Sequence, residues 1–109
     1  MSVQVLVAAM NQTDKSLIEK MNIQSDAIVG NQCSKNSIEN FKYGNHCITY
    51  LNFAEKGVGL NRNNALMRAT GKYCLFADDD MVYVDNYPNI VESWFKKILW
   101  NFFNFDFNL

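Results

Sequence analysis

The chain has 109 residues, 49% of them hydrophobic and 19% charged, which suits one small folded domain and argues against intrinsic disorder. Its net charge is −1 with scattered lysines and arginines, so a nucleic-acid partner is not expected. No apolar run reaches the ~20 residues of a membrane span. The first residues lack the features of a signal peptide, so a cytoplasmic location is expected. Three cysteines without paired spacing fit reduced thiols better than a zinc site.

The first residues predict a strand followed by a short helix. Residues 3–9 form a nearly continuous apolar run, which is typical of a strand buried on both faces of a parallel sheet. Polar residues interrupt this run, and Thr13 or Asp14 is the expected cap of the helix. The apolar residues of this helix, within 17–21, are expected to face the core.

Three further strands are predicted along the chain. Residues 27–30 form a second apolar run, and residues 47–51 are rich in β-branched and aromatic side chains. The mixed polar segment 34–44 between them is expected to be a loop that holds one helical turn. Residues 73–77 (YCLFA) give the strongest strand pattern in the chain.

Two more helices complete the predicted order. Residues 55–61 predict a glycine-containing loop, and residues 62–70 predict a helix that ends at Gly71. Pro88 suits the first turn of another helix, whose apolar residues recur at helical spacing up to residue 99. Strands that alternate with helices in this way predict a single α/β domain over 1–109, with three layers and a mostly parallel sheet.

The last helix and the tail carry much of the aromatic content. The apolar stripe of the helix is expected to face the core, and the alternative is a helix that lies on a membrane surface with Lys96 and Lys97 outside. Phenylalanines alternate with polar residues from residue 103 on, which predicts a strand. If these phenylalanines are not covered, they form an exposed patch that promotes homo-oligomerisation.

Three consecutive carboxylates, Asp78, Asp79 and Asp80, follow the strand at 73–77. Ligands of open α/β sheets bind outside the carboxyl ends of the strands. In an extended segment Asp78 and Asp80 share a face, and two such carboxylates repel each other unless a cation lies between them. Hard oxygen ligands favour Mg²⁺ or Mn²⁺, which usually also bind substrate phosphates. The alternative is a solvated acidic turn or a helix cap.

The run from Lys56 to Met81 (KGVGLNRNNALMRATGKYCLFADDDM) resembles glycosyltransferase family 2, the inverting enzymes of GT-A fold. The resemblance covers most of the chain and follows the family's order: a glycine-bearing loop, a helix with an Arg-Asn pair, a small residue and glycine, an apolar strand, and an acidic D-x-D motif. It implies a GT-A nucleotide-diphospho-sugar transferase fold, with the chain as the amino-terminal, nucleotide-sugar-binding half of a bacterial polysaccharide-type enzyme.

The resemblance also implies roles for individual residues. Asp80 would hold the metal that bridges the two phosphates, and Asp78 would lie near the ribose or share the metal's shell. The loop Ala9–Asn11 would contact the base and ribose, and Arg62 would approach the nucleotide or organise its loop, with a plain ion pair as its alternative role. The implied nucleotide-binding set is Ala9, Met10, Asn11, Asn31, Gly57, Arg62, Asp78 and Asp79, and the metal set is Asp78 and Asp80.

Two departures from the family pattern bear on activity. Asn31 stands where family members often have an Asp that reads the uracil N–H, and its amide oxygen is expected to accept that hydrogen bond instead. After Asp85 the remaining carboxylates, Glu92 and Asp106, are unconvincing as the catalytic base that deprotonates the acceptor. The chain is therefore expected to be truncated and weak or inactive in transfer.

Three functions remain open from the sequence. The first is transfer from a nucleoside diphosphate-sugar, with UDP-sugar favoured, to a glycan or lipid-linked saccharide acceptor at a site peripheral to the membrane or free of it. The second is a non-catalytic module that binds nucleotide or self-associates. The third is a phosphohydrolase that uses the aspartates, which is less favoured because Met81-Val82 follows them.

Overall fold

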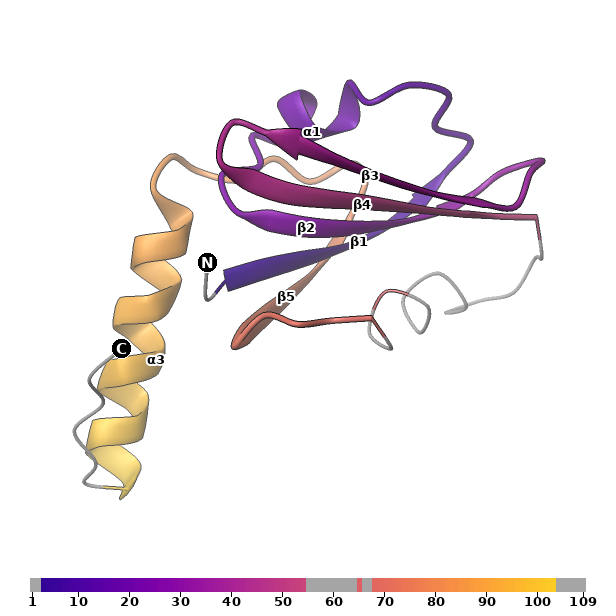
Figure 1. The fold of residues 1–109 in the computed structure, drawn as a ribbon. Helices are drawn as coiled ribbons and strands as arrows, with labels where there is room; N and C mark the ends of the chain where they lie inside the picture. Colours follow the sequence, from indigo (N-terminus) through magenta and orange to yellow (C-terminus); the bar gives the residue numbers. More distant parts are fainter. Residues whose placement is uncertain (1–2, 55–64, 66–67, 104–109) are drawn as a thin grey trace.

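The structure, a computed structural model, describes residues 3–54, 65 and 68–103, with side chains up to residue 98. One five-stranded sheet forms the centre of the molecule, in the order β3-β4-β2-β1-β5 (Figure 1). All neighbouring strands are parallel except the β3–β4 pair, which is antiparallel. The strands are β1 (Val3–Met10), β2 (Asp26–Gln32), β3 (Ser37–Tyr43), β4 (His46–Phe53) and β5 (Tyr73–Asp78).

The central strands confirm the predictions made from apolar runs. β1 lies between β2 and β5, and Val3, Val5 and Val7 are fully buried on one face of the sheet. Leu6 is fully buried on the other face, in a second cluster with Ile28. Because both faces of β1 are covered, its sequence is continuously apolar rather than alternating. The predicted α/β class and mostly parallel sheet are therefore confirmed.

The prediction for residues 34–44 was wrong, because this segment contains the edge strand β3. β3 pairs antiparallel with β4 through a tight turn in which Gly44 has φ +61°, a left-handed conformation that suits glycine. Its residues alternate between half-buried and exposed. Polar and charged side chains on an exposed edge discourage pairing with other chains. The same composition concealed the strand from the sequence pattern.

Helix α1 (Leu17–Lys20) is a single turn on one face of the sheet. Leu17 and Ile18 are buried as predicted, but the capping prediction was wrong. Ser16 occupies the cap position and makes no capping hydrogen bond through its side chain. Asp14 instead accepts hydrogen bonds from the backbone N–H of Ser16 at 2.9 Å and from its hydroxyl at 2.6 Å. These bonds hold the pKa of Asp14 below its usual value.

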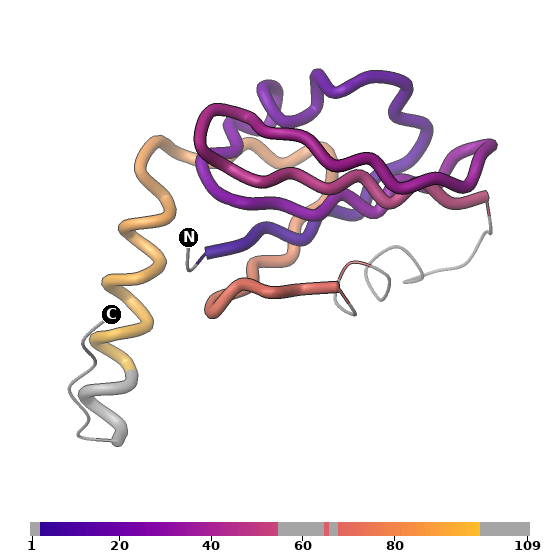
Figure 2. Tube along the Cα trace, viewed as in Figure 1, coloured from indigo at the N-terminus to yellow at the C-terminus, as the bar shows by residue number. Residues whose placement is uncertain are grey.

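Helix α3 (Tyr87–Phe103) begins with Pro88 in its first turn, as predicted, but then runs away from the sheet (Figures 1 and 2). Tyr87 anchors its start, because this side chain is buried and its hydroxyl lies 2.7 Å from that of Ser25. The prediction that the apolar stripe faces the core is confirmed only in part: Val91 packs against the core and the ring of Phe95 stacks on that of Tyr73 with centroids 4.6 Å apart, whereas Trp94 is 59% exposed and Ile98 is 42% exposed. Among the described helices, none is long and apolar enough to cross a membrane.

Some predictions fall on residues that the structure does not describe. The glycine-containing loop at 55–61 and part of the helix predicted over 62–70 lie outside the described residues, although Ala65 is helical. Residues 68–70 are described and are not helical, so the prediction that this helix ends at Gly71 was wrong. The strand predicted for the tail was wrong at its start, because α3 continues through Phe103. The rest of that tail, residues 104–109, lies outside the described part of the chain.

Candidate functional site

The strand order has a switch point at the carboxyl ends of β1 and β5, and we refer to this position as the crevice. After β1 the chain continues to β2 on one side of it, and later returns to form β5 on the other side. Loops that leave two such neighbouring parallel strands diverge, and the gap between them is the usual ligand site of open α/β sheets. Ala8 pairs with Asp78, so the loop after β1 and the aspartates after β5 emerge side by side.

The three aspartates do not continue the strand as the sequence analysis assumed. Asp78 is the last residue of β5, and the chain then turns, with the N–H of Met81 donating to the carbonyl of Asp78 at 3.1 Å. The alternation that would place Asp78 and Asp80 on one face of an extended strand therefore ends at Asp78. Both side chains are exposed nevertheless, whereas Asp79 is half-buried.

Asp79 connects this turn to the loop after β1. Its Oδ2 accepts a hydrogen bond from the backbone N–H of Met10 at 3.4 Å. This long bond joins the two sides of the crevice and turns the Asp79 carboxylate toward β1.

The donor atoms at this turn suit a divalent cation of the Mg²⁺ class. Carboxylate oxygens are the ligands that Mg²⁺ and Mn²⁺ prefer, and such ions usually keep waters and share phosphate oxygens with a substrate. Within the described residues, no group of three or more His, Cys, Asp or Glu side chains is assembled around one point. The three aspartates therefore do not by themselves form an assembled metal site among the described residues.

The loop after β1 has a defined backbone. Asn11 adopts a left-handed conformation, with φ +54°, and its N–H donates to the carbonyl of Gln32 at 2.7 Å. The side chains of Met10 and Asn11 are exposed. Ala9, which was expected to contact a nucleotide, is buried in the core at 1% exposure.

Asn31 has a different position from the one expected. Its side chain is fully buried, and its amide oxygen accepts the backbone N–H of Gln12 at 3.0 Å. The expectation that this oxygen accepts a hydrogen bond from a base is therefore corrected: the carboxamide is bonded inside the protein. Sequence analysis also missed Gln12 and Asn52, both of which bond Asn31. These pairings join separate strands and leave no local sequence signal.

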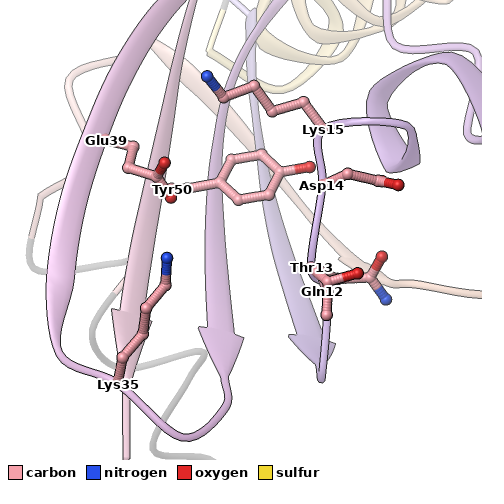
Figure 3. Close-up of a pocket in the computed structure, with 7 residues that line it drawn as sticks. All are labelled: Gln12, Thr13, Asp14, Lys15, Lys35, Glu39 and Tyr50. Atoms are coloured by element: carbon pink, nitrogen blue, oxygen red, sulfur yellow. The ribbon is translucent and has the colours of Figure 1, made fainter.

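A pocket of about 200 Å³ lies beside the loop, on the α1 face of the sheet (Figure 3). It contains two ammonium groups and two carboxylates, so its formal charges balance. Burial, with Asp14 and Glu39 nearby, raises the pKa of Tyr50 to about 12. The residues that line the pocket are Gln12, Thr13, Asp14, Lys15, Lys35, Glu39 and Tyr50.

The structure thus brings part of the predicted set together. Asp79 contacts the loop after β1 at Met10, and Asp78 and Asp80 flank Asp79 in the chain, whereas Asn31 lies beneath that loop. Gly57 and Arg62 lie outside the described residues. Exposed carboxylates and exposed polar loop residues therefore lie at the same end of the sheet.

Comparison with known proteins gives one match. The model of the family described as "Glycosyl transferase family 2" matches residues 11–97, which is well over half of the chain. The matched region contains β2 to β5, the aspartate turn and most of α3. Neither the curated proteins nor the solved structures gave a match.

Proposed function

The chain belongs to glycosyltransferase family 2, and from this premise we propose that the crevice between β1 and β5 binds a nucleoside diphosphate-sugar, with UDP-sugar as the donor. The observation that supports this most directly is the contact of Met10 with Asp79, because it holds the loop after β1 against the aspartate turn. The diphosphate would lie at the turn and the nucleoside at the loop.

Asp78 and Asp80 would hold Mg²⁺ or Mn²⁺. Such an ion neutralises the charge that develops on the departing diphosphate. Asp79 would have a different role, because the hydrogen bond that it accepts from the Met10 N–H stabilises the loop after β1. The exposed carboxamide of Asn11 offers both donors and an acceptor to the base or ribose.

In the proposed reaction, an acceptor hydroxyl on a glycan or lipid-linked saccharide attacks the anomeric carbon from the face opposite the diphosphate. A new carbon–oxygen bond forms, the bond to the diphosphate oxygen breaks with inversion, and the hydroxyl proton passes to a carboxylate base. We do not assign that base to Glu92, because it lies on α3, the helix that leaves the sheet.

Calorimetric titration with UDP in Mn²⁺ and in EDTA tests the donor site. Wild-type protein should bind UDP only with the metal, and Asp80→Asn should weaken binding by about tenfold or more, since a carboxylate ligand is lost. Glu19→Gln is the matched control, because Glu19 is an exposed carboxylate on α1. Equal UDP affinity with and without metal, or in Asp80→Asn and wild type, would contradict the assignment.

A second candidate function, self-association, is favoured by the exposed apolar side chains of α3. Trp94, Phe95 and Ile98 are 59%, 38% and 42% exposed on a helix that projects from the sheet. Burying such a stripe against a second copy would remove apolar surface from water.

Sedimentation of Ile98→Glu tests self-association. We expect wild-type protein to form a concentration-dependent dimer and Ile98→Glu to shift it toward monomer, because a buried charge in an apolar contact is costly. Ile38→Glu is the matched control, since Ile38 is 55% exposed on the edge strand β3. A monomeric wild type at all concentrations, or equal effects of the two substitutions, would exclude α3 as the interface.

A further inference from the structure

Asn31 lies at the end of β2, directly beneath the loop that follows β1. Its carboxamide makes two hydrogen bonds to one backbone residue: Oδ1 accepts from the N–H of Gln12 at 3.0 Å, and Nδ2 donates to the Gln12 carbonyl at 2.8 Å. This paired arrangement resembles the exchange between two strands. The side chain therefore extends the β1–β2 pairing past the point where the loop leaves β1.

The second hydrogen of the same Nδ2 fixes the orientation of the amide. It donates to Oδ1 of Asn52, on β4, at 2.8 Å. The Nδ2 of Asn52 donates in turn to Oγ of Ser37 at 3.0 Å and to Oε2 of Glu39 at 2.7 Å. The carboxylate at the end of this row is a strong acceptor, and linked hydrogen bonds of this kind strengthen one another.

The two amides of this row, those of Asn31 and Asn52, are buried. Asn31 is fully buried and Asn52 is 5% exposed, so water does not compete for these bonds. Rotating either amide by half a turn would place NH₂ against a donor and oxygen against an acceptor, which costs free energy in a buried site. The row extends from the loop after β1 across β2 and β4 to β3, where Glu39 also lines the pocket of Figure 3.

The loop that Asn31 holds is the one that carries Asn11. A left-handed residue costs free energy even for asparagine, so the surrounding bonds must stabilise it. On the β5 side, among the described residues, the loop is held by the 3.4 Å bond from the N–H of Met10 to Asp79. On the β2 side it is held by both Asn31 bonds to Gln12 and by the bond from the Asn11 N–H to the Gln32 carbonyl.

We propose that Asn31 is a positioning residue for the donor nucleoside, and that Asn52 and Glu39 keep its amide in the required orientation. This inference rests on the proposed function. Asn31 does not contact the base; it fixes the loop whose exposed atoms do. The position requires a carboxamide, because a carboxylate would face the carbonyl of Gln12 and Oδ1 of Asn52, both of which are acceptors.

Titrating Asn31→Asp with two ligands in Mn²⁺ separates positioning from folding. UDP uses both the loop and the aspartate turn, whereas inorganic pyrophosphate uses the turn alone. We expect the Kd for UDP to rise about tenfold or more while the Kd for pyrophosphate stays within about twofold of wild type. The loss should shrink as the pH falls toward the pKa of the introduced carboxyl, because its protonated form regains one donor.

Two further variants complete the test. Asn52→Ser keeps Asn31 in place but removes the oxygen that orients it, and it should show a smaller loss of UDP affinity with pyrophosphate again unchanged. If Asn31→Asp does not fold, Asn52→Ser provides the test in its place. Asn40→Asp is the matched control, because Asn40 is exposed on β3 and bonds only the hydroxyl of Thr49 among the described residues. It should bind both ligands like wild type.

Hydrogen exchange at the Gln12 amide provides a readout that needs no ligand. This amide should exchange faster in Asn31→Asp and in Asn52→Ser than in wild type. Unchanged UDP affinity in both variants, or equal losses for UDP and pyrophosphate, would overturn the inference. A wild-type chain that binds pyrophosphate and UDP equally well would overturn it too. If the wild type bound neither ligand, the donor site itself would fall, and this inference with it.

Discussion

Two tyrosine hydroxyls, those of Tyr50 and Tyr73, are buried without a hydrogen-bond partner in the described part of the chain. Burying a hydroxyl without a partner costs about 1–3 kcal/mol. The ring of Tyr50 lies in the core near Phe41, with the two ring centroids 5.6 Å apart. The buried ring of Tyr50 therefore adds to the stability of the fold, whereas its unpaired hydroxyl lowers that stability.

Tyr50→Phe should leave the free energy of unfolding unchanged or raise it by up to about 1 kcal/mol, because only the unpaired hydroxyl is lost. The variant should also resist alkali better. The pKa of Tyr50 is raised from 10.0 to about 12. Between these two pH values the Tyr50 hydroxyl ionises in the unfolded chain before it ionises in the folded one, so stability falls as the pH rises. Wild type should lose up to about 2 kcal/mol more than the variant there.

Urea unfolding at a series of alkaline pH values measures this difference. The pKa values of Tyr83 and Tyr87 are also raised by burial, so the comparison of Tyr50→Phe with wild type isolates Tyr50. Tyr43→Phe is the control, because Tyr43 is an exposed tyrosine on β3. Parallel stability curves for wild type and Tyr50→Phe would show that the hydroxyl has a partner.

At the residue scale, the sequence indicated which residues gather but not what each one does. Asp78, Asp79 and Asp80 stand out because they follow a buried strand, and that position did place them at the crevice. Their separate roles depend on a turn that starts at Asp79, which no periodicity reveals. Asn31 was found by its position, yet its bonds to Gln12 and Asn52 arise only when three segments meet.

Among the elements, the segment that leads into β5 depends on a close approach to β1. A Cβ at Gly71 would lie 2.5 Å from Cβ of Gln4 and 3.1 Å from its backbone nitrogen. Oε1 of Gln4 accepts the N–H groups of Thr70 at 2.8 Å and Gly71 at 3.0 Å. Gly71 was predicted as a helix terminator, whereas this contact gives it a packing role.

Gly71→Ala should therefore lower the free energy of unfolding by about 1–3 kcal/mol, because the added methyl group displaces β1 or breaks the Gln4 bonds. Gly44→Asn is the contrasting variant, since Gly44 has open space around it and φ +61°, a conformation that asparagine tolerates. It should cost well under 1 kcal/mol. Thermal unfolding measures both, and equal stability of Gly71→Ala and wild type would show that the two segments can separate freely.

The elements that the sequence predicted well are those whose own residues are buried on both faces. β1 and β2 are continuous apolar runs because neighbouring strands and both layers cover them. The sequence pattern did not reveal β3, because an edge strand needs only one neighbouring strand and no burial on both faces. The side chains of β3 are accordingly mostly polar. α3 was recognised as a helix by its spacing, but spacing does not say how much of the apolar face meets a core: here Val91 packs against the core, whereas Trp94 and Ile98 are exposed.

For the whole molecule, the structure separates a sheet with its crevice from a projecting helix. The radius of gyration is 14.8 Å, compared with about 13 Å for a compact domain of this length. The principal extents of 48 × 27 × 21 Å reflect the same elongation (Figure 2). Events at the crevice should therefore have little effect on most of α3.

Hydrogen exchange with UDP and Mn²⁺ should display this separation. We expect slower exchange at the amides of Met10, Gln12 and Met81, because ligand binding stabilises the loop and the turn that carry them. Amides of α3 beyond its first turns should exchange at unchanged rates and provide the internal control. Uniform protection of the sheet and α3, or protection of α3 alone, would contradict a donor site at the crevice.

The order of the strands also bears on how the chain is made. Strands β1 to β4 are close together in the sequence, so they can pair early as the chain emerges from the ribosome. The other edge of β1 stays unpaired until β5 has been synthesised, because Val3 pairs with Tyr73, which is far along the chain. Until β5 pairs with β1, the backbone N–H and C=O groups of that edge can pair with a strand of another chain. The same late step brings the aspartates to the loop, so nascent chains should remain both vulnerable to misassembly and unable to recognise a nucleotide until it is complete.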